Sequence, residues 1–190
     1  CIQKPYDPGH GEDDENELIE RYERGEFFEQ DSIRQTGEAY TTLIGRTVYG
    51  GGGITPDIFV PEDTSDITSY YKEAVFEGHI RQFAFDYTDD NRPALNKCET
   101  VAELEAFLKK QSLPERFAAY AEQQGLRRRN LMLHRSRRLF ERAIIGNIIY
   151  NARDIEEYTQ YLNEDDPTVL KALKLVEEHA TRPKNTLPDE

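Results

Sequence analysis

The fold is decided at residues 40–61, which read YTTLIGRTVYGGGGITPDIFVP. This stretch is rich in β-branched and aromatic residues and is divided by four consecutive glycines, Gly50–Gly53. Residues of the first kind favour strands, and glycine permits the positive φ of a tight turn. The sequence therefore predicts two strands, Thr41–Tyr49 and Ile54–Val60, on either side of a Gly50–Gly53 turn.

Helical periodicity dominates the chain from Thr64 onward. Apolar residues recur at steps of three and four between Ile67 and Tyr87, and the preceding Thr64, Ser65 and Asp66 can each cap a helix. This segment predicts one long helix.

Three further signals predict the helices that follow. Residues 100–103 and 112–115 match the capping box, in which Ser or Thr is followed three residues later by Glu. A sustained apolar stripe from Asn130 to Asn163 predicts the spine of the helical part, with Gly146 as a candidate kink. Asp166-Pro167 then marks the start of a last helix.

These patterns predict an α+β fold that is mainly α, with a small β element followed by a multi-helix carboxy-terminal bundle. Residues 1–63 carry the β element and a short helical insertion that Gly25 is placed to end. Residues 64–182 are expected to form the helical domain. Residues 183–190 are expected to form a flexible tail.

Composition narrows the classes of function. The 190-residue chain has a net charge of -13 and a mean hydropathy of -0.80, so general binding to nucleic acid is disfavoured. No apolar run approaches the roughly 20 residues of a membrane span. Cys1 and Cys98 have no metal-ligand spacing, which leaves their redox state open. Because residue 1 is Cys, we expect a fragment or processed product; an acylated Cys1 is the less favoured alternative.

The sequence contains no catalytic, cofactor-binding or metal-binding constellation, and we assign no such residue and no cofactor. Gly50–Gly53 is followed by Thr55-Pro56-Asp57 rather than by Gly-Lys-Ser/Thr, so a structural turn is favoured over a phosphate loop. The four histidines lack metal or nucleophile spacing: His10, His79, His134 and His179. No serine stands in a nucleophile motif with a lysine: Ser32, Ser65, Ser69, Ser112 and Ser136.

One basic island interrupts the acidic chain. It comprises Arg127, Arg128, Arg129, Arg135, Arg137 and Arg138. A nucleic-acid stripe is one interpretation. Pairing with acidic segments or with an upstream domain is favoured at this net charge.

Residues 45–61 resemble the end of the protease domain in carboxy-terminal processing peptidases, also called tail-specific proteases. That domain closes with a strand, a glycine turn and a Gly-Ile-x-Pro-Asp segment, which Gly53-Ile54-Thr55-Pro56-Asp57 matches. Residues 1–6, CIQKPY, look like the continuation of the family strand that ends in Thr-Pro-Ser-Gly-Arg. The insertion and the long helical tail are similar to longer, Bacteroidetes-like members.

The resemblance implies a serine nucleophile with a lysine base and a PDZ module, all upstream of this chain. It further implies a periplasmic or cell-envelope location. The expected partners are the upstream protease and PDZ domains, protein or peptide substrates and a second copy in a homodimer. The chain would be the non-catalytic portion, which completes the protease sheet and adds a docking or regulatory domain. The alternative is a stand-alone acidic helical protein-interaction module.

Overall fold

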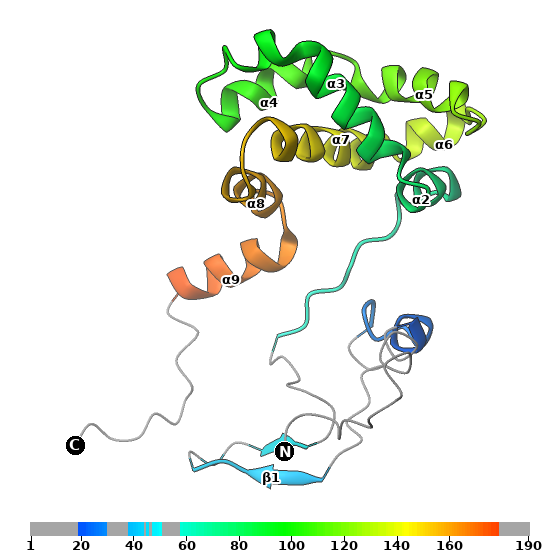
Figure 1. Cartoon of the computed structure of the whole chain (residues 1–190). Coiled ribbons are helices and arrows are strands. Elements are labelled where there is room, and N and C mark those ends of the chain that lie inside the picture. The colour runs from blue at the N-terminus through cyan, green and yellow to red at the C-terminus, as the bar shows by residue number, and fades with distance from the viewer. Residues whose placement is uncertain (1–18, 30–37, 44, 46, 51–57, 179–190) are drawn as a thin grey trace, which may run out of the picture. The chain divides into compact units, whose positions relative to one another are not determined.

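The computed structural model describes residues 19–29, 38–43, 45, 47–50 and 58–178. These residues form mostly helices together with a two-stranded antiparallel sheet (Figure 1), so the predicted mainly α, α+β class is confirmed. The chain divides into two compact units, residues 1–63 with 171–190 and residues 64–170. The predicted tail, residues 183–190, lies outside the described residues.

The β element is a short hairpin. Strand β1 (Ala39–Thr41) pairs with β2 (Thr47–Tyr49). The amide of Gly45 donates to the carbonyl of Thr42 at 2.9 Å, and Gly45 has a φ of +78°. The prediction of one strand from Thr41 to Tyr49 was therefore wrong. The chain reverses within it, because Gly45 can adopt the left-handed conformation that β-branched neighbours avoid.

The second predicted strand, Ile54–Val60, is not formed by its described residues. Ile58, Phe59 and Val60 have no strand partner. Residues 51–57, which hold most of the glycine turn and the Gly-Ile-x-Pro-Asp match, lie outside the described residues. The turn predicted at Gly50–Gly53 stays a prediction.

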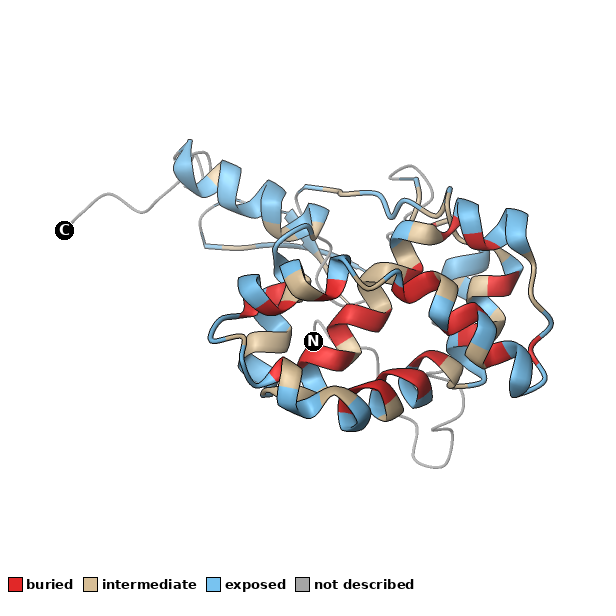
Figure 2. Ribbon diagram, turned by 90° about the horizontal axis from the view of Figure 1, so that it is seen from above, coloured by how far each residue is buried: buried red, intermediate tan, exposed pale blue. Residues whose placement is uncertain are grey.

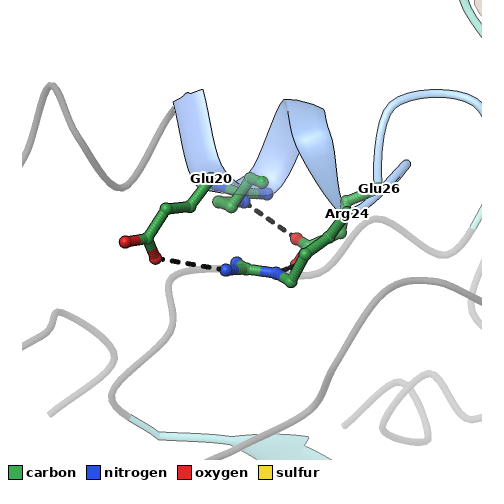
Figure 3. A network of polar contacts seen from close by, with 4 residues as sticks. Glu20, Arg24 and Glu26 are labelled. Carbon is green, nitrogen blue, oxygen red and sulfur yellow. Dashed lines mark hydrogen bonds and ion pairs between the residues drawn. The ribbon is translucent and has the colours of Figure 1, made fainter.

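A charged turn follows the helical residues 19–23. Gly25 ends this helix with a φ of +81°, as the sequence predicts. Next to it, the Glu26 side chain is buried and accepts hydrogen bonds of 2.9 Å from Arg21 and from Arg24. Arg24 also reaches Glu20 (Figure 3). Burial raises the pKa of Glu26, but the two guanidinium groups outweigh it and lower the pKa overall.

The second unit is built from helices. Their bounds are α2 (Ser69–Phe76), α3 (His79–Leu95), α4 (Val101–Lys109), α5 (Leu113–Gln123), α6 (Asn130–Arg135), α7 (Arg137–Ala152) and α8 (Ile155–Asn163), and α9 (Pro167–Glu177) begins at its end. Helices α3 and α7 pack together most extensively. Buried residues gather on the faces that the helices turn toward one another (Figure 2).

The long helix expected before Tyr87 is two helices. Thr68, rather than the earlier candidates, caps α2, and its hydroxyl accepts from the amide of Tyr71 at 3.3 Å. Gly78 then takes a φ of +77° and separates α2 from α3. The prediction of a single helix was wrong. Apolar residues have the same helical spacing in α2 and in α3, so the spacing does not show where one helix ends and the next begins.

The predicted spine at residues 130–163 is also divided. It breaks at Ser136 and again at 153–154, giving α6, α7 and α8. Gly146 is not the break, since α7 runs through it. A Cβ at Gly146 would lie 3.3 Å from Cε2 of Tyr158 and 3.5 Å from Cε1 of Tyr161. The glycine therefore allows α8 to pack closely on α7.

The predicted helix caps differ in outcome. The Thr100 hydroxyl accepts from the amide of Glu103 at 3.2 Å, which confirms that cap. Asp166 caps α9 through the amides of Thr168 and Val169, at 2.8 and 3.0 Å, as predicted. The prediction for Ser112 was wrong: its φ is +49° and its side chain caps nothing.

The core of the helical unit combines aromatic and aliphatic side chains. Phe117 and Phe140 are fully buried, with ring centroids 5.2 Å apart. Ile144 and Ile148 of α7 are also fully buried. Helix α7 contacts α3, α4, α5, α6 and α8, and its buried apolar residues hold the bundle together.

Candidate functional site: a groove over α3, α5 and α7

An open groove of about 650 Å³ lies on the helical unit. Its walls come from the first half of α3, the end of α5 and the second half of α7. Most of the side chains that line it are carboxamides or aromatic rings, among them Gln82, Phe85, Tyr120, Gln124, Asn147 and Tyr150. Its volume falls within the roughly 300–1,000 Å³ that ligand sites occupy.

Asp86 fixes one wall of the groove. Its Oδ2 accepts from the hydroxyl of Tyr120 at 2.9 Å, and its Oδ1 accepts from Nε2 of Gln82 at 2.8 Å. Burial, followed by the hydrogen bond to Asp86, raises the pKa of Tyr120 to about 12. Tyr120 therefore remains a neutral hydrogen-bond donor at physiological pH, and α5 is joined to α3 at the groove.

The opposite wall belongs to α7. Asn147 donates through Nδ2 to the carbonyl of Ala143 at 2.8 Å, and its amide oxygen remains chemically able to accept. Tyr150 is 53% exposed, and its ring meets that of Tyr158 from α8 edge-on at 5.5 Å. Tyr150 thus presents a supported aromatic surface.

The charged residues of the groove come from one short segment. His79 Nε2 lies 2.9 Å from an oxygen of Glu77, and Arg81 is exposed beside them. Both signs of charge are therefore present at this end. The arrangement suits a ligand with neutral hydrogen-bonding groups and apolar surface better than a strongly charged one.

No sequence motif indicated this groove. Its residues are spread from Glu77 to Asn151 and come from three helices. Carboxamides on a helix ordinarily indicate a solvated face. The weak signal was Asn147, a polar residue that stands between the apolar pairs Ile144-Ile145 and Ile148-Ile149.

Two of the serines noted in the sequence, Ser69 and Ser136, have structural side-chain contacts. Ser136 is fully buried, donates to the carbonyl of Asp66 at 2.6 Å and lies 2.8 Å from Oγ1 of Thr68. Ser69 donates to the sulfur of Met132. None of these partners is a lysine, so neither serine resembles an activated nucleophile. Ser32 lies outside the described residues.

Members of the basic island pair within their own unit. Arg129 lies 2.8 Å from a carboxylate oxygen of Glu73, and Arg137 forms an ion pair with Glu115. The hydrogen bond from Arg137 lowers the pKa of Glu115. Arg135 donates to the carbonyl of Ser65. These contacts favour the pairing interpretation over a nucleic-acid stripe.

The remaining sequence candidates form no cluster in the described part of the chain. There, His79 pairs with Glu77, His134 is exposed, and Cys98 is a free, partly exposed thiol. No three His, Cys, Asp or Glu residues gather as metal ligands among the residues described. In those same residues, every helix is too short or too polar to cross a bilayer. His10 and His179 lie outside the described residues.

Comparison with known proteins gives one match. The model of a family of unknown function (DUF8443) matches residues 70–154, which include every residue that lines the groove. Neither the curated proteins nor the solved structures contain a match.

Proposed function

We propose that this chain is the carboxy-terminal, non-catalytic portion of a serine-type endopeptidase that processes proteins from their carboxyl ends. Gly53-Ile54-Thr55-Pro56-Asp57, preceded by three further glycines, carries the proposal. Residues 1–63 complete the protease sheet. The helical unit is a docking or regulatory domain, and the serine and lysine of the catalytic dyad belong to the upstream domain, in the periplasm or cell envelope.

The glycine motif has a physical role in such a sheet. Strands that meet at a crowded edge need backbone with positive φ and without a Cβ, and Pro56 stiffens the entry to the last strand. A strand supplied by this chain would pair with strands of the upstream domain. The helical unit, with its own aromatic core and its groove, supports a binding role rather than a chemical one.

Hydrolysis of an unfolded protein tests this proposal. Fluorescein-labelled casein is incubated with the natural full-length protein and, separately, with the 190-residue chain. We expect hydrolysis by the full-length protein and none by the chain, because a nucleophile and its base must lie within about 2.6 to 3.2 Å of each other. Repurified chain that still cleaves casein contradicts the proposal, as does an inert full-length protein.

A stand-alone protein-interaction module is the second candidate. The groove favours it, since a binding unit needs no upstream enzyme. The mass of the native polypeptide distinguishes the two candidates. A native protein that begins near Cys1 supports the stand-alone module, and one with an upstream domain supports the peptidase.

A further inference from the structure

We propose that the groove over α3, α5 and α7 binds an extended polypeptide segment. Its carboxamides would hydrogen-bond to peptide units, and its exposed aromatic rings would hold a side chain of the bound segment. That the bound segment belongs to a substrate of the same enzyme rests on the proposed function. That the groove binds a polypeptide does not rest on it.

The aromatic side chains supply the apolar contact. Phe85 and Tyr150 line the groove and are 52% and 53% exposed, one from α3 and the other from α7. Large aromatic rings that remain half in water gain most from being covered by a partner. Tyr150 is braced by Tyr158, so little side-chain freedom is lost when a ligand covers it.

The carboxamides match the chemistry of the peptide bond. Gln124 and Asn151 line the groove along with Asn147, and each carboxamide offers both a donor and an acceptor. A peptide unit likewise presents one N–H and one C=O. Side chains of this kind can therefore bind main chain without selecting a sequence, which suits a domain that handles many proteins.

The electrostatics favour a peptide over a saccharide or a nucleic acid. Asp86 does not line the groove and is directed to Tyr120 and Gln82, so the groove presents no carboxylate of its own except Glu77 to bind sugar hydroxyls. The positive charge of Arg81 is accompanied by Glu77 at the same end of the groove. With a net charge of -13 on the chain, a phosphate backbone would be repelled.

Fluorescence anisotropy on the intact 190-residue chain tests the inference. The probe is fluorescein-labelled, dephosphorylated casein, which is unfolded, at an ionic strength that screens surface charge beyond about 8 Å. The test variant combines Phe85→Ala with Tyr150→Ala. The matched control is Phe76→Ala, because Phe76 is an aromatic residue that is 94% exposed and does not line the groove.

We expect the double variant to weaken binding about tenfold or more, as truncation of aromatic anchors does, and the control to change it less than about twofold. Circular dichroism of both variants checks that the helices are retained. Three results overturn the inference: no binding by the wild-type chain, equal binding by the double variant, or displacement of casein by maltoheptaose.

This experiment is separable from the test of the proposed function because anisotropy requires no hydrolysis. Casein binding through the groove, with an inert full-length protein, refutes the peptidase proposal alone. An active full-length protein whose carboxy-terminal chain binds no casein refutes the groove inference alone.

Discussion

Replacing Ile144 by aspartate tests whether α7 is the centre of the helical unit. Ile144 is fully buried in the hydrophobic core. The side chains of this core carry no positive charge that could pair with a carboxylate. Truncating such a residue costs about 2–5 kcal/mol, and an unpaired buried carboxylate adds a desolvation cost. Because a domain's whole stability is about 5–15 kcal/mol, Ile144→Asp should unfold or loosen the bundle.

The matched control is the same substitution at Ile155, which is 57% exposed and is the first residue of α8. There the new carboxylate lies at a helix N-terminus, so the expected change is within about 0.5 kcal/mol. Urea titrations followed by circular dichroism compare the two variants. The deficit of Ile144→Asp should shrink as pH falls, since protonation removes the buried charge. A midpoint equal to that of the wild type would refute the reasoning.

Three further predictions follow from the helical unit. Gly146→Leu should destabilise by about 1–3 kcal/mol, because Tyr158 and Tyr161 occupy the space, and unchanged urea unfolding would contradict this. Thr100→Ala should cost about 1 kcal/mol through loss of its cap, whereas Ser112→Ala should cost less, and thermal melts that reverse this order would argue against the assigned caps. Because the pKa of Tyr120 is raised to about 12, its neutral hydroxyl stabilises the fold fully below pH 10, and this contribution is lost as pH rises from 10 to about 12. The urea midpoint should therefore fall less steeply over that pH range in Tyr120→Phe than in the wild type. An equally steep fall in both proteins would speak against this contribution.

The fold class followed from periodicity, but the breaks between helices did not. Apolar spacing of three and four residues correctly indicated helix on both sides of Gly78 and of Ser136. An apolar stripe records which face is buried, and two helices packed on one core can share a stripe across a short turn. The break at Gly78 depends on its left-handed φ, which the sequence does not show. The break at Ser136 depends on long-range hydrogen bonds to Asp66 and Thr68.

The groove could not be predicted in the same way, because it depends on tertiary packing. A hydrogen bond joins Asp86 of α3 to Tyr120 of α5. Nothing in the sequence between these two residues indicates that contact. The basic island shows the opposite case. Its net-charge context favoured pairing, and two of its six arginines, Arg129 and Arg137, form ion pairs with acidic residues of the same unit.

The direction of processing is the most direct test of the central proposal. The natural full-length protein is given one unfolded protein with a free carboxyl end, and the same protein with that end fused to a stable folded domain, and the products are identified by mass spectrometry. The account predicts cleavage of the free form, resistance of the blocked form and no cleavage of either by the 190-residue chain. Equal cleavage of both forms, or cleavage of neither by the full-length protein, would contradict it.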